Sequence, residues 1–397
     1  MRLNFMGYLR PDGTVGVRNH VAVLPAINCM NDIAYRLAEE CGAVALCHSL
    51  VCTYAKEDKA KAERALIGMG LNPNIAAVLV LGVGCESYKA DYLAKEIAKS
   101  GKQVLALSIS THDYDDIISQ GASFLNTQIE AAQNQQRIPC DVSNLMIGIK
   151  CGGSSPLSAI SNNAAVGKAM DILIGEGGSA IFSETVEILG ADKVLANNAA
   201  TPECAKKLEN TVKRLKTNIA SYGVDILGSE PTEGNILSGL TTIEEKSLGA
   251  IIKAGTTPLQ DVLEFAEKPS TKGLFFMDCE AAGDSVFAGA MGAGSQIALF
   301  SIANGYGTRF RGMPSCSSSG IFAYPTLKVL GSNRDIAQKD YFDCYVGGLV
   351  SGEETLSEAG EKVFQTILQI ASGKLTFTES YNKYYGTITF GRNSLVM

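Results

Sequence analysis

Cysteine and histidine side chains recur in this chain directly after short apolar runs. Five such runs have the length and composition of buried β-strands, at Val21–Ile27, Ala43–Leu46, Ala77–Val83, Val104–Ile109 and Leu145–Ile149. They are followed, in chain order, by Cys29, His48 with Cys52, Cys85 with Glu86, His112, and Cys151. In an open parallel sheet, ligands bind outside the carboxyl ends of the strands, so these side chains are expected to converge on one crevice. Thiols and imidazoles suit metals such as iron and zinc. The pattern therefore favours an enzyme with a metal or iron–sulfur site over a binding module.

Strands alternate with helices along the chain, which is typical of doubly wound parallel sheets. Helices are expected at Asn31–Cys41, Ala55–Met69, Tyr88–Ser100, Tyr114–Gln135, Asn163–Glu176 and Pro202–Tyr222. Later strands are expected at Ser179–Phe182, Leu274–Met277, Gln296–Phe300 and Leu327–Leu330, and loops at Ser229–Gly239 and Gly305–Ser319. With the polar stretch Asn134–Pro139 as linker, the sequence predicts an α/β fold with doubly wound, mostly parallel Rossmann-like sheets in two domains, 1–137 and 138–397.

Charge and hydropathy exclude two classes of partner. The net charge is −7 and no basic block is present, which argues against a nucleic-acid ligand. No apolar run reaches the roughly 18 residues of a membrane-spanning helix. The 11 cysteines are odd in number, and the N-terminal residues Met1–Phe5 lack the apolar core of a signal peptide. A reducing, cytoplasmic location is therefore expected.

A series of short motifs occurs in one order over nearly the whole chain. These are Gly13–Asn19, Leu24–Cys29, His48–Cys52, Leu81–Glu86, Cys151–Ser154, Ser183–Glu187 with Gly190, Gly234–Asn235, and Gly239–Gly249. Together they resemble the altronate/galactarate dehydratase family, which includes the large subunits of sulfolactate sulfo-lyases. The chain departs from that family at Ser155, where an acidic residue is usual, and in the segment Ala303–Gly312. A small β-clip domain, fused or on a separate subunit in relatives, is not found in this sequence.

The resemblance implies a cytoplasmic carbon–oxygen lyase that dehydrates a hydroxy acid, most often a sugar acid. A proton alpha to the carboxylate is removed and the beta-hydroxyl leaves. A divalent cation can stabilise both charges as a Lewis acid, and the resemblance implies Fe²⁺ or a similar ion such as Mn²⁺. The residues alone also allow an iron–sulfur cluster on Cys52, Cys85 and Cys151 with one open iron.

Two alternative functions remain open from the sequence. The altered loop Gly305–Gly320 is compatible with C–S cleavage of a sulfonated hydroxy acid. Loss of the acidic residue at Ser155 and of the β-clip domain is compatible with a non-catalytic subunit that depends on a partner. The expected partners are a small-molecule acid, a small β-clip subunit and further copies of the chain.

Metal and catalytic roles fall on the strand-end side chains. The predicted metal ligands are His48, Cys52, Cys85, Glu86 and Cys151. The predicted catalytic residues are His48, which can titrate near neutral pH, Glu184, and Lys246, which either binds the substrate carboxylate or acts as a base when desolvated. The alternatives are structural: a buried free cysteine packs as a small hydrophobe, and Glu86 can cap a helix.

Substrate binding is predicted for two further segments. The turn Gly152, Gly153 and Ser154 can present backbone N–H groups to an anion ahead of a helix, and Asn235 lies in the Gly-Asn motif. Arg309 and Arg311 can clamp a second acid group with paired hydrogen bonds. The alternative for these arginines is a solvated surface.

Overall fold

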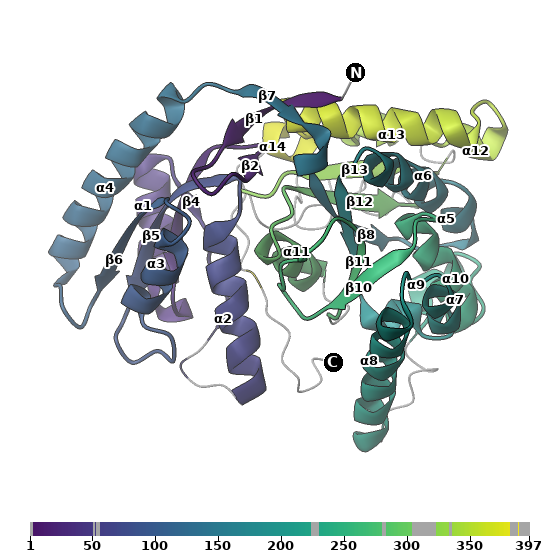
Figure 1. Ribbon diagram of the computed structural model, residues 1–397, viewed down its shortest axis with the longest axis horizontal. Helices are drawn as coiled ribbons and strands as arrows, with labels where there is room; N and C mark the ends of the chain where they lie inside the picture. Colours follow the sequence, from purple (N-terminus) through teal and green to yellow (C-terminus); the bar gives the residue numbers. More distant parts are fainter. Residues whose placement is uncertain are drawn as a thin grey trace.

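Two parallel β-sheets make up the core of the computed structural model (Figure 1). The structure describes residues 3–50, 52, 56–223, 230–279, 283–303, 323–332, 336–381 and 388. Every strand pair within these two sheets is parallel, so the predicted α/β class is confirmed. No helix within the described ranges is long and apolar enough to cross a lipid bilayer.

The smaller sheet has four strands in the order β4 (Val44–Ala45), β3 (His20–Pro25), β5 (Ile75–Gly82) and β6 (Gln103–Ser108). Helices α1 (Asn31–Cys41) and α4 (Tyr114–Asn134) cover one face. Helices α2 (Lys56–Leu71) and α3 (Ala90–Ala98) cover the other. The strands are apolar on both sides because both of their faces are buried, which is the usual pattern for parallel sheets.

The larger sheet has seven strands. Their order is β10 (Leu259–Leu263), β11 (Gly273–Met277), β9 (Ser179–Phe182), β8 (Met146–Gly152), β12 (Ile297–Ile302), β13 (Thr326–Leu330) and β14 (Cys344–Tyr345). Helices α6 (Asn162–Gly175), α8 (Pro202–Ser221) and α13 (Leu356–Ala371) share a core with one face. Helix α11 (Gly283–Gly292) packs on the other. Shorter helices are α5 (Pro156–Ile160), α7 (Asp192–Asn197), α9 (Glu233–Leu237), α10 (Ile243–Ile251), α12 (Gly348–Ser351) and α14 (Phe377–Tyr381).

Helices α2 and α11 join the two sheets through one shared apolar core (Figure 1). They cross at Gly68 and Gly292, where a Cβ on Gly68 would lie 2.1 Å from the carbonyl oxygen of Gly292. Only glycine permits such a backbone-to-backbone contact. The two sheets are therefore packed as one body rather than strung on a free linker.

A third, antiparallel sheet is built from segments that precede and follow the smaller sheet in the sequence. Its order is β2 (Val15–Gly16), β1 (Asn4–Leu9) and β7 (Ile138–Asp141). The predicted linker Asn134–Pro139 therefore contains the end of α4 and the start of β7. The prediction of a loop over Ser229–Gly239 was wrong for α9, because Thr232 caps that helix and the side chain of Asn235 returns to the backbone N–H of Thr232.

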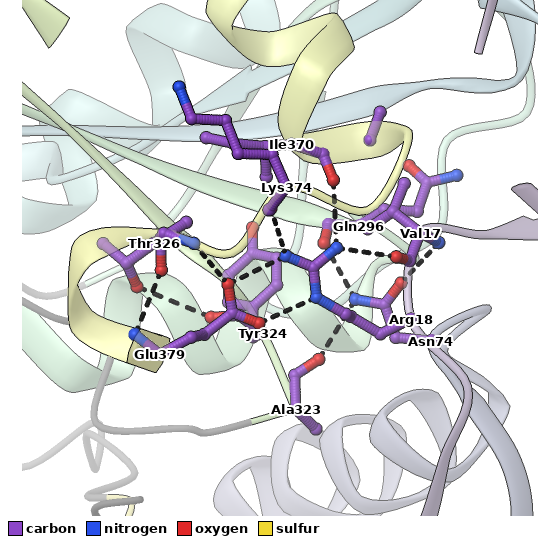
Figure 2. Close-up of polar contacts among 12 residues, drawn as sticks. Val17, Arg18, Asn74, Gln296, Ala323, Tyr324, Thr326, Ile370, Lys374 and Glu379 are labelled. Atoms are coloured by element: carbon purple, nitrogen blue, oxygen red, sulfur yellow. Dashed lines mark hydrogen bonds and ion pairs between the residues drawn. The ribbon is translucent and has the colours of Figure 1, made fainter. Parts of the chain in front are cut away.

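Arg18 ties the start of the chain to its C-terminal part (Figure 2). Its guanidinium makes two hydrogen bonds to Glu379, at 2.7 and 2.8 Å. It also donates to the carbonyl oxygens of Val17, Ile370 and Lys374, at 2.8–3.0 Å. All five N–H groups of the guanidinium are thus engaged. Because the group is buried, this motif arginine has a structural role.

Candidate active site

Four of the sequence motifs meet at the carboxyl ends of β8 and β9. Helix α10 contacts both α5 and the short 3₁₀-helix Thr185–Ile188 that follows β9. Asn235 donates a hydrogen bond of 3.1 Å to the carbonyl oxygen of Ser154. At Gly190 a Cβ would lie 2.7 Å from the side chain of Glu244, so these segments are in close contact. Residues spread over about a hundred positions of the chain thereby form one site. The site lies at the carboxyl ends of parallel strands, where ligands bind in such sheets.

Glu184 holds a strained position directly after β9. Its φ is 79°, in the left-handed region that non-glycine residues rarely adopt. One carboxylate oxygen, Oε1, lies 2.6 Å from the ammonium of Lys150 on β8. The other, Oε2, is buried and has no hydrogen-bond partner in the described part of the chain. Strain of this kind concentrates at active sites, and a buried carboxylate oxygen without a partner is poised to accept a proton.

Opposing electrostatic effects set the pKa of Glu184. Burial and the negative charge of Glu187 raise the pKa of Glu184 to about 7, against the opposing effect of the Lys150 and Lys253 ammonium groups. A carboxyl group with this pKa is partly ionised at neutral pH, which suits a general base.

Cys151, Glu187 and Lys253 form a second buried group beside Glu184. The Cys151 thiol donates to Glu187 Oε2 at 3.5 Å, and Lys253 Nζ lies 3.1 Å from the same oxygen and 3.3 Å from the sulfur. Burial opposes ionisation of Glu187, but Lys253, Lys150 and Lys246 lower its pKa to about 2. Burial likewise opposes the charge on Lys253, while the Glu187 carboxylate raises the pKa of its ammonium group.

Cys151 is a neutral thiol in this setting. Burial, with the charge of Glu187, raises the pKa of Cys151 to about 11. The thiol donates its hydrogen bond to Glu187, so Cys151 belongs to the ion cluster.

Lys246 is also part of this region. It lies on α10, is 8% exposed, and pairs with Glu230. Three lysines thus meet three glutamates in the pairs Lys150–Glu184, Lys253–Glu187 and Lys246–Glu230. When Glu184 is protonated the cluster carries one net positive charge, which favours an anionic ligand.

The predicted anion turn lies beside this cluster. Gly153 has φ of 61°, a conformation that glycine adopts without strain. The turn leads into α5, with Ser158 accepting a hydrogen bond of 2.9 Å from the N–H of Ser155. Gly152, Gly153, Ser154 and Asn235 are thus brought together, and their binding of substrate stays a prediction. Arg309 and Arg311 lie outside the described residues.

His48 is held by backbone on both sides of its ring. Nε2 lies 2.6 Å from the carbonyl oxygen of Pro25, and Nδ1 accepts a hydrogen bond of 3.2 Å from the N–H of Leu50. Burial lowers the pKa of His48 to about 4, although the bond to Pro25 opposes that shift. Both ring nitrogens thus have backbone partners, and the metal and proton-transfer roles of His48 stay predictions.

The other predicted metal ligands lie at the end of the smaller sheet. Glu86 Oε2 accepts hydrogen bonds from the N–H groups of Val83 and Gly84, at 3.2 and 2.6 Å, and so closes the turn before α3. Cys52 and Cys85 are exposed and free. Among the described residues, no three His, Cys, Asp or Glu side chains stand close enough to hold one metal ion. The predicted five-residue ligand set therefore does not fit a single ion here.

The sequence predictions missed Lys150, Glu187 and Lys253. Glu187 lies inside one of the motifs above and Lys150 directly precedes Cys151, so the motifs pointed to both positions. Lys253 follows the last motif by a few residues, and no motif pointed to it.

The fold and the site define an α/β enzyme. At the carboxyl end of its parallel sheet, a buried carboxyl group with a pKa of about 7 lies among lysines. Residues 7–133 match the family model "D-galactarate dehydratase/Altronate hydrolase, second domain" and residues 142–392 match "D-galactarate/Altronate dehydratase, C-terminal". The chain belongs to the D-galactarate/altronate dehydratase family, and is therefore a lyase of the dehydratase type.

Three relatives show the range of the family. The chain is 33% identical over 380 residues to (2R)-sulfolactate sulfo-lyase subunit beta of Chromohalobacter salexigens, covering 95% of this chain and 94% of the relative. It is 31% identical over 385 residues to altronate dehydratase of Bacillus subtilis, covering 94% and 74%. It is 28% identical over 402 residues to galactarate dehydratase (L-threo-forming) of Escherichia coli, covering 95% and 74%.

Proposed function

We propose that this protein is a hydro-lyase that removes water from a hydroxy acid of the sugar-acid class. The observation that carries the proposal is Glu184, a strained and buried carboxylate with a free oxygen and a pKa of about 7. Dehydration of such an acid begins with loss of the proton alpha to the carboxylate, which needs a base of this kind.

In the proposed reaction Glu184 takes the alpha proton on Oε2 while Lys150 holds Oε1. The substrate then carries a second negative charge, and the nearby lysines stabilise it. Lys246 binds the substrate carboxylate in place of Glu230. Return of the proton from Glu184 to the departing hydroxyl completes the loss of water, so that protons balance.

A divalent metal remains part of the proposal. The family resemblance implies Fe²⁺ or Mn²⁺, and such an ion would polarise the substrate carboxylate or the leaving hydroxyl. Because the predicted ligands do not converge, no step above depends on it.

The test is an anaerobic assay of the full chain against altronate, galactarate and related sugar acids, with and without Fe²⁺, Mn²⁺ and reductant. Formation of a 2-oxo acid from at least one sugar acid is expected. Absence of product from every acid, under every metal condition and with Glu184 intact, contradicts the proposal.

A second candidate is C–S cleavage of a sulfonated hydroxy acid. It is favoured by the relative of which this chain covers 94%, a sulfolactate sulfo-lyase subunit. The first step is the same, but sulfite leaves instead of hydroxide. Release of sulfite from sulfolactate in the same panel, without products from sugar acids, would select this reaction.

A partner subunit is the third element of the proposal. The relative from Chromohalobacter salexigens is named as subunit beta. A small partner chain is proposed on that ground, and assembly into a homo-oligomer stays a prediction from the sequence. Activity that appears only after a small β-clip protein is added would support it.

Replacement of Lys246 by methionine should lower turnover by at least about 100-fold, the usual scale for a lost acid–base or charge partner. The reason is the loss of a buried ammonium next to Glu187 and Glu230. Initial rates of the two proteins, with circular dichroism to check folding, measure the effect. Lys207→Met, which removes an exposed ion pair with Asp261, is the matched control. Unchanged turnover in Lys246→Met would assign this lysine a structural role.

A further inference from the structure

The residue before Glu184 is bound to the end of strand β11. Pairing of β9 with β11 runs as far as Phe182 and Phe276. Beyond that point the hydroxyl of Ser183 donates a hydrogen bond of 2.8 Å to the carbonyl oxygen of Met277. Ser183 is buried, so this bond is shielded from water and extends the link between the two strands.

The residue after Glu184 makes three hydrogen bonds to the same segment. The N–H of Thr185 donates to the carbonyl oxygen of Cys279 at 2.9 Å. Its hydroxyl donates to Asp278 Oδ1 at 2.7 Å and accepts from the N–H of Cys279 at 3.2 Å. The other oxygen of Asp278 pairs with Arg214 on α8, so this carboxylate is itself held in place. We call Ser183, Thr185 and Asp278 the β11 clamp.

The backbone of Glu184 needs this support because it is strained. Its φ of 79° lies in the left-handed region, and a side chain other than glycine persists there only where the surrounding structure fixes it. Glycine would adopt the same φ without strain. The chain thus keeps a carboxylate at a position that its backbone alone would disfavour.

The strained backbone also sets the direction of the carboxylate. Oε1 of Glu184 lies 2.6 Å from the ammonium of Lys150, and Oε2 is the buried oxygen proposed to take the proton. The direction of the Cα–Cβ bond follows the backbone, so a return of φ to the usual negative range would turn the side chain away from Lys150. The hydrogen bonds on either side of Glu184 oppose that return.

We propose that Thr185 is a positioning residue, whose hydroxyl and N–H hold Glu184 in the strained conformation that directs its carboxylate to Lys150. Thr185 is buried and acts on the reaction only through Glu184, so the inference rests on the proposed role of Glu184 as the base. Valine has nearly the shape of threonine but no hydroxyl, whereas serine keeps the donor and acceptor of the hydroxyl. These two replacements therefore isolate the two hydrogen bonds of the hydroxyl.

Initial rates of the full chain, with the preferred acid from the panel above, give the first measurement. Thr185→Val should lower kcat by about 10–100-fold, since displacement of a catalytic group by about 1 Å can cost about 100-fold. KM should stay near the wild-type value, because the proposed substrate contacts come from Lys246 and the turn Gly152–Ser154. Thr185→Ser should recover most of kcat. Thr366→Val removes another buried hydroxyl, on α13, and as the matched control should keep the wild-type kcat.

Crystal structures of the same variants, without substrate, give the second measurement. In Thr185→Val, φ of Glu184 should leave the left-handed region and its contact with Lys150 should be lost. In Thr185→Ser, φ should stay near 79°. Circular dichroism checks the fold, and Asp278→Ala replaces Thr185→Val if that variant does not fold. It removes the acceptor of the same hydroxyl at a half-buried position, and should change φ and kcat in the same direction.

Each outcome decides the inference. An unchanged φ or an unchanged kcat in Thr185→Val, or an equal loss of kcat in Thr185→Ser, would overturn it. If the wild-type protein turned over no acid, the hydro-lyase proposal would be contradicted. The crystal structures alone would then decide whether the β11 clamp holds Glu184 in its strained conformation.

Discussion

Replacement of Glu184 by glutamine is expected to lower kcat by at least about 100-fold, within the 10²–10⁴-fold range for loss of a general base. Glutamine keeps the shape of the side chain and its contact with Lys150 but cannot accept the alpha proton. Initial rates with the preferred acid measure the effect. Glu176→Gln, on an exposed helix end, is the control and should match wild type. Retained activity in Glu184→Gln would move the base elsewhere.

The pH dependence should carry the same signature. Because Glu184 must be ionised to act, kcat/KM should rise with pH through about 7. The contribution of Glu184 to stability changes with pH in the opposite direction. The folded-state pKa lies above the ordinary value of 4.5, so the contribution of the neutral carboxyl is fully present below about 4.5 and is lost as pH rises through about 7. Thermal melts of wild type and Glu184→Gln across this window should converge at low pH, with the variant more stable at high pH.

Replacement of Lys253 by methionine should reduce the free energy of unfolding by about 3–5 kcal/mol, the cost of breaking a buried ion pair. The ammonium and the Glu187 carboxylate are 2% and 7% exposed, so the remaining carboxylate would be left charged and unpaired. Urea unfolding followed by circular dichroism gives the difference.

Two variants make this result specific. Lys207→Met breaks a pair whose side chains are 42% and 44% exposed, and should cost only about 0.2–1 kcal/mol. The double variant Lys253→Met/Glu187→Gln should recover a large part of the loss, because it removes the stranded charge. If Lys253→Met proved no less stable than Lys207→Met, the Lys253–Glu187 pair would not stabilise the site.

Strand positions were predictable because continuous apolar runs mark strands that are buried on both faces. The short strand Leu259–Leu263, interrupted by Gln260 and Asp261, lacked that mark and was missed. The strand-end rule correctly placed the motif residues at sheet edges. It grouped Cys151 with Cys52 and Cys85, although the predicted domain boundary already separated them and β8 belongs to the larger sheet.

The chemistry of the site was harder to foresee than its position. Glu184 was predicted, but its pKa depends on Lys150 and Glu187, which meet it only in the folded chain. His48 looked available in the sequence because the backbone groups that occupy its ring, at Pro25 and Leu50, become neighbours only when the sheet forms.

The contact between Arg18 and Glu379 joins residues 361 positions apart, and it bears on how the protein is made. A ribosome releases the strands of the smaller sheet first, and N-terminal parts generally fold first. Arg18 nevertheless remains without its carboxylate until α14 has emerged, and Ile388, which bridges to His48, comes later still. The contacts of Arg18 with Glu379 and of His48 with Ile388 can therefore form only after those later residues have been synthesised.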